Sequence, residues 1–278
     1  MFYKISENQA GFKTGYSTVD NAFVLNSVIS RALSKKHGKL YVAFIDFHKC
    51  FDTIDRTCLW TIIKERGIKG KLYSAIHSMY NCVKSCIRCN NERSEYIDCT
   101  IGLKQGCLAS PILFSLFIDE FEMILRQSDI RGIQLHPDIV QLFLLMFADD
   151  IALLSDTVNG LQSQLNILAD FCETYKLKVN ESKTKIVAFK KGGRLSRHEK
   201  WTYMHHNVEV VNRFCYVGLT FTRQLSLNEM VSELCTKGKR TLISIYCIKM
   251  VRFQNLYFSR YLILKYVLNF VMVLKYGA

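Results

Sequence analysis

The sequence predicts an α+β domain in which helices pack on one face of a mainly antiparallel sheet. Two apolar runs, 39–47 and 139–147, are too short for typical helices and are followed or ended by acids, so they predict buried strands. An apolar stripe after Thr157 recurs at helical spacing and predicts an amphipathic helix. Strand and helix patterns do not alternate regularly, which disfavours a parallel sheet wound with helices.

The first half of the chain supplies one strand, two helices and a hairpin. The strand 39–47 carries Asp46 at its end, and Gly67 stops the helix that follows. A pair of asparagines, Asn90 and Asn91, favours a turn between two short β-segments. The predicted elements are helices over Asp55–Glu65 and about Lys69–Tyr80, and hairpin arms over Val83–Arg88 and Ser94–Cys99.

The second half begins with a helix and a strand–turn–strand unit. Ser110 is predicted to be an N-cap, with Pro111 at the first helical position. The pair Asp149-Asp150 separates two apolar strands, and Thr157 then caps the amphipathic helix. The predicted elements are a helix over Ile112–Arg126, strands over 139–147 and Ile151–Leu154, a helical stripe of Leu161, Leu165, Leu168 and Cys172, strand pairs at 184–189 and 208–221, and helix from about Leu227.

The composition favours a polyanionic partner. The chain has 278 residues, of which 49% are hydrophobic, enough for a sizeable core, and a formal net charge of +13. An excess of Lys and Arg at this level is typical of proteins that bind nucleic acid or an anionic membrane surface. Charge alone does not exclude a basic protein without such a partner. No linker or repeat marks a domain boundary.

The cysteines indicate a reducing compartment. Eleven cysteines occur without a secretory signal, so we expect free thiols and an intracellular location, nucleus or cytoplasm. Cys82, Cys86, Cys89 and Cys99 could also form a zinc site, but the spacing is irregular and the hairpin interpretation is favoured. The apolar stretch Leu256–Tyr276 contains Arg260 and Lys265, so a packed helix is favoured over a membrane span.

Acidic residues at strand ends are the sharpest functional feature. Asp149 and Asp150 occupy the tip of a hydrophobic hairpin, and Asp46 ends another apolar strand. Carboxylates brought together repel one another unless cations neutralise them, and Mg²⁺ suits oxygen ligands completed by substrate phosphates. If the two strands are neighbours, Asp46 and Asp149 make a two-metal site. The alternative is that Asp149 and Asp150 are turn residues without a role in chemistry.

Six segments, in the family's order, resemble the motifs of reverse transcriptases. The residues Phe-Ile-Asp-Phe and Lys-Thr-Lys within them resemble the non-LTR (LINE-like) retrotransposon branch. Phe147–Asp150 resembles the [Tyr/Phe]-x-Asp-Asp box, and Ala43–Asp52 the first acidic motif. Gly102–Phe114 resembles Gly-x-x-Gln-Gly-x-x-x-Ser-Pro-x-Leu-Phe. The other three are Gln9–Thr18 (Gln-x-Gly-Phe-Arg-x-Gly-x-Ser-Thr), Asn180–Lys185 (Asn-x-x-Lys-Thr) and Phe214–Leu219 (Phe-x-Tyr-Leu-Gly). In the first of them this chain departs from the family, because Lys13 and Tyr16 stand where LINE-like sequences usually carry arginines.

The resemblance implies a right-hand polymerase palm and a role for each matched residue. It implies two Mg²⁺ ions held by Asp46 and Asp149 with the carbonyl of Phe47, while Asp150 shapes the site and its field and is a weaker direct ligand. Lys183 would neutralise or protonate the departing pyrophosphate. The remaining implied roles are exclusion of a 2′-hydroxyl by Phe51, contact with nucleotide and template by Gln105, Gly106 and Lys13, and primer grip by Tyr216 and Gly218.

The resemblance also implies domains, partners and an activity. Residues 1–38 would be partial fingers, 39–222 the palm with an inserted fingers-like hairpin, and 223–278 the start of a truncated, helical thumb. The partners would be an RNA template, a DNA primer and deoxynucleoside triphosphates; no membrane partner and no oligomeric state is predicted. The activity would be RNA-directed DNA synthesis. The alternatives are an inactive retrotransposon remnant that at most binds nucleic acid and, disfavoured by the Gln-Gly box, a two-metal nuclease.

Overall fold

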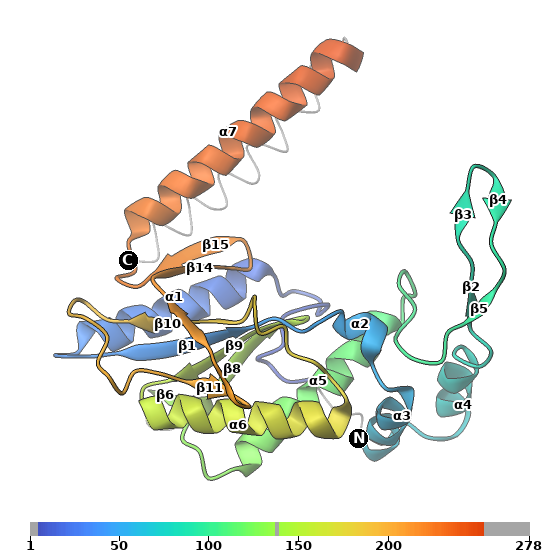
Figure 1. The fold of residues 1–278 in the computed structure, drawn as a ribbon, viewed down its shortest axis with the longest axis horizontal. Helices are drawn as coiled ribbons and strands as arrows, with labels where there is room; N and C mark the ends of the chain where they lie inside the picture. Colours follow the sequence, from blue (N-terminus) through green and yellow to red (C-terminus); the bar gives the residue numbers. More distant parts are fainter. Residues whose placement is uncertain (1–4, 137–138, 253–278) are drawn as a thin grey trace. The chain divides into compact units, whose positions relative to one another are not determined.

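The computed structural model describes residues 5–136 and 139–252 of the chain. Contacts divide the chain into two compact units, 1–230 and 231–278. The first unit contains the sheet and the helices that pack on it, drawn in Figure 1. The helices are α1 (Thr18–Ser34), α2 (Cys50–Thr53), α3 (Arg56–Glu65), α4 (Gly70–Ser78), α5 (Ser110–Gln127), α6 (Val158–Tyr175) and α7 (Leu227–Arg252), the last of which continues into the second unit.

In the described residues, five strands form the central sheet in the order β13-β10-β1-β9-β8. All neighbouring pairs are antiparallel except β10 and β13. The α+β class predicted from the sequence is therefore confirmed, as is the mainly antiparallel sheet. The strands are β1 (Leu40–Ile45), β8 (Leu144–Phe147), β9 (Asp150–Ser155), β10 (Lys185–Phe189) and β13 (Glu209–Val211).

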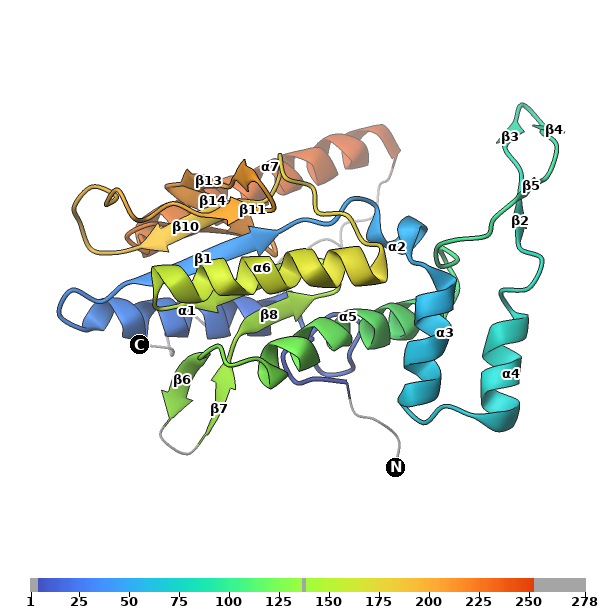
Figure 2. The same ribbon diagram turned by 60° about the horizontal axis from the view of Figure 1, so that its bottom comes forward.

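The two faces of the sheet are covered by different elements, as Figures 1 and 2 show. Strand β1 is buried on both faces because all six of its residues are apolar. On one face Tyr41, Ala43 and Ile45 join the core made with α5 and α6. On the other, Phe44 stacks on Phe214 at 4.4 Å between ring centroids, and α1 packs nearby. The sequence predicted helices on one face, and the structure adds α1 on the second.

Helix α6 follows its sequence signal closely. The Thr157 hydroxyl accepts a hydrogen bond from the Gly160 amide at 3.0 Å, so Thr157 is the N-cap that the sequence predicted. The predicted stripe is buried against the sheet, and it comprises Leu161, Leu165, Leu168 and Cys172.

Three sequence predictions were wrong in detail. The run 139–147 is not one strand: β7 (Ile139–Leu142) pairs with residues 133–136 outside the central sheet, and only β8 belongs to that sheet. Ser110 is the first residue of α5 and Ala109 is the N-cap, because the Ser110 hydroxyl instead bonds to the Lys104 carbonyl (2.7 Å) and the Tyr80 hydroxyl (2.9 Å). Residues 184–189 do not form a separate strand pair. They form β10, whose residues 186–189 are apolar and buried, and it lies inside the central sheet between β1 and β13.

Smaller hairpins lie outside the central sheet. The hairpin predicted around Asn90 and Asn91 is present as two short ladders, and neither arm is buried. None of the helices in the described residues is long and apolar enough to cross a membrane. The predicted packed helix over Leu256–Tyr276 lies outside the described residues. The hairpin strands are β2 (Lys84–Ser85), β3 (Arg88–Cys89), β4 (Glu92–Arg93), β5 (Ile97–Asp98), β6 (Ile133–His136), β7 (Ile139–Leu142), β11 (Thr202–Tyr203), β12 (His206–Asn207), β14 (Arg213–Tyr216) and β15 (Leu219–Thr222).

Candidate active site

Three carboxylates meet at one end of the central sheet. Asp46 directly follows β1, and β1 pairs with β9 so that Ile45 lies opposite Ile151. Phe147 and Asp150 are paired across the β8–β9 hairpin, which leaves only Ala148 and Asp149 in the turn. This register places Asp46, Asp149 and Asp150 at the same end of neighbouring strands, which is the condition on which the predicted two-metal site depends.

Asp150 lies close enough to the other two carboxylates for their charges to affect its ionisation. The pKa of Asp150 is raised above its ordinary value by desolvation and then by the negative charges of Asp149 and Asp46. The Cys50 thiol donates to Asp149 Oδ2 at 3.5 Å. Burial, followed by the charge of Asp149, raises the pKa of Cys50, so this thiol stays neutral at physiological pH. The site concentrates negative charge that a cation would neutralise.

The backbone of Asp46 is held by the turn after α6. The Asn180 amide donates to the Asp46 carbonyl at 2.7 Å, and the Asp46 amide donates to the hydroxyl of the buried Thr184 at 3.2 Å. Lys183, in the same turn, extends its ammonium to 3.8 Å from the Asp46 carboxylate. Sequence reasoning assigned a role to Lys183 and missed Thr184, although Thr184 belongs to the same Asn-x-x-Lys-Thr box.

The oxygen donors fit a hard divalent cation. Among residues 5–136 and 139–252, no three His, Cys, Asp or Glu side chains converge tightly enough to hold a metal by themselves. Two carboxylates and the backbone carbonyl of Phe47, the residue after Asp46, are the kind of partial ligand set that Mg²⁺ uses when substrate phosphates complete it. The cysteines of the hairpin, Cys82, Cys86, Cys89 and Cys99, are free thiols.

Phe51 lies directly after Cys50, whose thiol contacts Asp149. Its ring stacks on Phe114 with 4.2 Å between centroids, and Phe12 approaches its edge at 6.0 Å. The partly exposed Phe51 ring is therefore fixed by two aromatic neighbours beside the carboxylates.

Gln105 lies at the mouth of an open pocket of about 900 Å³. Its amide donates to Asp52 Oδ1 at 2.8 Å. Gly106 adopts a φ of +83°, and a methyl group there would meet open space, so backbone conformation requires glycine and leaves room beside it. Arg56 fixes the loop before Gln105 by donating to the carbonyls of Tyr80, Cys99, Ile101 and Gly102.

Tyr216 is an anchor inside the fold. Its side chain is 2% exposed, and its hydroxyl bonds with Asn21 Nδ2 and with the Leu145 carbonyl, each at 3.3 Å. Burial raises the pKa of Tyr216, so the hydroxyl stays protonated. Gly218 turns the β14–β15 hairpin with a φ of +90°. The Lys13 ammonium pairs with Glu7 at 2.8 Å and lies over the Tyr16 ring.

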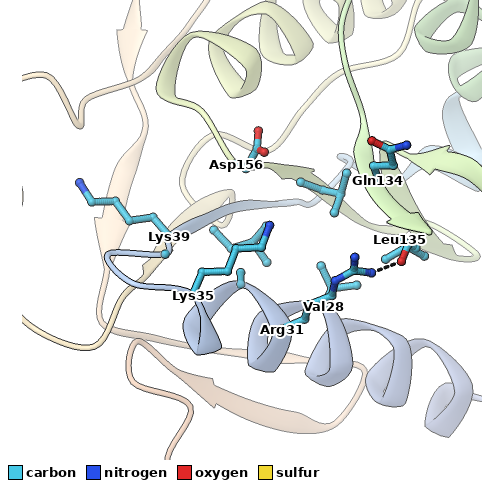
Figure 3. A pocket seen from close by; sticks show the side chains of 11 residues that line it. Val28, Arg31, Lys35, Lys39, Gln134, Leu135 and Asp156 are labelled. Atoms are coloured by element: carbon cyan, nitrogen blue, oxygen red, sulfur yellow. Dashed lines mark hydrogen bonds between the residues drawn. The ribbon is translucent and has the colours of Figure 1, made fainter. Parts of the chain in front are cut away.

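A second open pocket, of about 570 Å³, lies at the opposite end of the strands (Figure 3). Leu40, the first residue of β1, lines it, whereas Asp46 follows the last residue of that strand. Arg31 and Lys35 of α1 also line it, and Arg31 donates to the Leu135 carbonyl. This pocket is separate from the carboxylate site.

The chain matches the family described as "Reverse transcriptase (RNA-dependent DNA polymerase)" over residues 1–221. The "Retrovirus-related Pol polyprotein from type-1 retrotransposable element R2" of Nasonia vitripennis is 25% identical, over 58% of this chain and 15% of its own length. The "Retrovirus-related Pol polyprotein from type-2 retrotransposable element R2DM" of Drosophila melanogaster is 30% identical, over 66% of this chain and 17% of its own length. The chain thus spans less than a fifth of these relatives.

Solved structures share the fold. Telomerase from Candida albicans, in complex with a TWJ fragment of telomeric RNA, matches with a TM-score of 0.54 and 15% identity, over 76% of this chain and 34% of that one. Telomerase from Candida tropicalis, in complex with a TWJ fragment of telomeric RNA, matches with a TM-score of 0.54 and 14% identity, over 78% and 33%. At this sequence identity the likeness shows a shared arrangement of strands and helices, and the chemistry has to be argued from the residues of the site.

Proposed function

Because this chain belongs to the reverse transcriptase family, as its six sequence boxes predicted, we propose that it extends a DNA primer along an RNA template by adding deoxynucleotides. The observation that carries the proposal is the strand register that brings Asp46 beside the Asp149-Asp150 turn. A palm-like sheet that ends in three mutually repelling carboxylates suits phosphoryl transfer, which depends on positioning and on charge neutralisation.

Asp46 and Asp149, with the carbonyl of Phe47, are the proposed ligands of two Mg²⁺ ions. When bound, two such ions supply charge neutralisation at the attacking and leaving oxygens. Asp150, whose pKa is raised by desolvation and then by its acidic neighbours, adds negative potential next to the ligands when it is ionised. Asp149 is partly exposed, which leaves it accessible to a cation from solvent.

Lys183 is proposed to stabilise the departing pyrophosphate. Its side chain is 68% exposed and its ammonium is 3.8 Å from Asp46, so a small rotation can move it from the carboxylate to a bound phosphate. An ammonium with three rotatable donors is suited to that task. The local pairing with Asp46 keeps the cation at the site before substrate arrives.

Phe51, Gln105 and Gly106 are proposed to contact the incoming nucleotide and the templating base. The Phe51 ring, fixed against Phe114, would overlap a ribose 2′-hydroxyl and so favour deoxynucleotides. The open space beside Gly106 allows a base pair to approach the backbone. Gln105 would exchange its bond with Asp52 for one with the nucleic acid.

The primer end is proposed to lie against the β14–β15 turn. Since Tyr216 is buried, its contribution is to anchor this hairpin to β8 through Asn21 and the Leu145 carbonyl. Gly218, at the turn, is then the part that meets the primer backbone. Lys13 would contact template phosphate, and the net charge of +13 would make binding weaken as salt rises.

Primer extension on an RNA template tests the proposal. The full chain with Mg²⁺ and deoxynucleoside triphosphates should lengthen a labelled primer. Asp149→Asn should reduce the rate by more than about 100-fold, because loss of a metal ligand should cost more than the loss of a residue that only hydrogen-bonds to a ligand. Asp156→Asn is the matched control, because Asp156 lies at the other end of the same strand and should leave the rate unchanged. Synthesis that survives Asp149→Asn contradicts the assigned site; its absence from the folded parent chain supports an inactive remnant.

A further inference from the structure

The side-chain amide of Gln9 forms hydrogen bonds with both backbone polar groups of Ala148, in the carboxylate turn between β8 and β9 (Ala148 and Asp149). Gln9 is fully buried, and its Oε1 accepts hydrogen bonds from the amides of Ala148 (2.9 Å) and Gly11 (2.8 Å). Its Nε2 donates to the Ala148 carbonyl at 3.3 Å. Both backbone polar groups of the residue before Asp149 are thus bonded to one side chain that is 139 positions away in the sequence.

The turn that Gln9 holds has an unfavourable backbone. Ala148 has a φ of +55°, a left-handed conformation that costs an L-residue about 1–2 kcal/mol. A positive φ at the first of two central residues is the pattern of a type II′ hairpin turn, in which glycine is the usual residue at that position. An alanine persists in such a conformation only when its surroundings fix it.

The segment that carries Gln9 is itself firmly attached. The Asn8 carbonyl accepts from the Met146 amide at 2.8 Å, and the Ala10 amide donates to the Met146 carbonyl at 2.9 Å, so Gln9 lies beside β8 like an added strand. The Asn8 side chain also donates to the buried Glu122 of α5 at 2.7 Å. Gln9 is therefore a rigid support and not a mobile loop residue.

We propose that Gln9 is a positioning residue for Asp149: by fixing Ala148 on both sides, it sets where the Asp149 carboxylate enters the metal site. The proposal rests on the function proposed above and goes beyond it. The competing explanation is that Gln9 only satisfies buried polar groups and stabilises the fold. The two differ because a positioning residue affects the turn and the use of metal more than it affects global stability.

Two variants separate these explanations. Gln9→Met keeps the size of the side chain and removes all three hydrogen bonds. Gln9→Glu keeps an acceptor for the Ala148 and Gly11 amides and loses the bond to the Ala148 carbonyl. Gln164→Met is the matched control, since Gln164 is equally buried and its amide donates to the Leu154 carbonyl (3.0 Å), toward the other end of β9.

Hydrogen exchange of the full chain tests the contact without any need for activity. Peptides that cover residues 145–152 should lose protection in Gln9→Met and keep it in Gln164→Met, because only the first variant frees the Ala148 amide. Gln9→Glu should be intermediate. Unchanged exchange in Gln9→Met, or equal loss in both methionine variants, would overturn the inference, even if the parent chain proves to be inactive as a polymerase.

Primer extension then tests the consequence for chemistry. In an active parent chain, Gln9→Met should lower kcat about 10- to 100-fold and raise the Mg²⁺ concentration for half-maximal rate, with little change in the KM of the deoxynucleotide. Gln9→Glu should recover part of the rate. A kcat that falls only in proportion to lost stability, as in Gln164→Met, would reduce Gln9 to a structural role and overturn the proposal.

Discussion

Gly11→Ala is a severe perturbation of the carboxylate turn for so small a change. A Cβ at Gly11 would lie 2.1 Å from the Ala148 nitrogen and 2.9 Å from its Cα. Ordinary contact begins at 3.4 Å, so the two backbones must separate by about 1.3 Å. Because both contacting atoms belong to backbone, rotation of a side chain cannot relieve the overlap.

The expected loss follows from the size of that displacement. Ala148 directly precedes Asp149, and a misplacement of about 1 Å in a reacting geometry can lower the rate by about 100-fold. Overpacking of this kind costs about 1–3 kcal/mol of stability, so the chain should still fold. We therefore expect Gly11→Ala to lower the single-turnover rate of primer extension about 100-fold at saturating nucleotide.

Two other glycines provide the controls. A Cβ at Gly38 would lie 1.8 Å from the Ala32 carbonyl oxygen, at the end of the sheet opposite the carboxylates, so Gly38→Ala matches the strain without disturbing the turn. A Cβ at Gly192 would meet open space, so Gly192→Ala should change neither the rate of primer extension nor the stability. Urea denaturation gives the stability of each variant. If Gly38→Ala lowers the rate as much as Gly11→Ala, or if Gly11→Ala retains the parent rate, close packing against Ala148 does not position Asp149.

Further predictions concern acid stability, charge coupling and nucleotide choice. Burial of Glu199 opposes ionisation, but hydrogen bonds from Lys190, Lys39, the Ser196 amide and Tyr41 outweigh it and lower the pKa of Glu199 from 4.5 to about 2. Because the folded pKa is depressed, this stabilisation is present above pH 4.5 and is lost as the pH falls toward 2. It is worth about 3 kcal/mol. Urea denaturation of Glu199→Gln across that pH range should therefore lack this fall in the free energy of unfolding. The pKa of Asp150 should be above the ordinary aspartate value in metal-free protein, and Asp46→Asn should lower it in an NMR titration, since one of the charges that raise it is removed. An unmoved midpoint would contradict the contribution of the Asp46 charge to the pKa of Asp150. Phe51→Ala should increase incorporation of ribonucleotides relative to deoxynucleotides in primer extension, and an unchanged ratio would remove Phe51 from the sugar site.

The sequence predicted those features whose signals are local. The apolar run before Asp46, the Asp149-Asp150 turn between two apolar strands and the Thr157 cap of α6 were each read from neighbouring residues, and each is present. Family membership was likewise predicted from six short boxes and is confirmed by the match over residues 1–221.

Features that depend on distant partners were beyond local signals. Ser110 has the residue type of an N-cap, yet its hydroxyl is engaged by Lys104 and Tyr80. The place of β10 between β1 and a parallel β13 depends on pairing across the fold, which propensity does not encode. Gln9 and Thr184 stand inside recognised boxes, but their contacts with Ala148 and Asp46 span 139 and 138 positions.

These distant contacts explain how three carboxylates remain together at the end of the sheet. Desolvation raises the pKa of Asp150 most, and the charges of Asp149 and Asp46 raise it further, so the carboxylates repel and a flexible turn would relax by moving apart. The backbone of Asp46 is instead bonded to Asn180 and Thr184, and the residue before Asp149 is bonded to Gln9. Repulsion is thereby retained until a cation arrives, and little reorganisation is needed when it does. Boxes that are far apart in the sequence thus act as one support for the acids, which is why substitutions in the supporting residues should affect chemistry before they affect the fold.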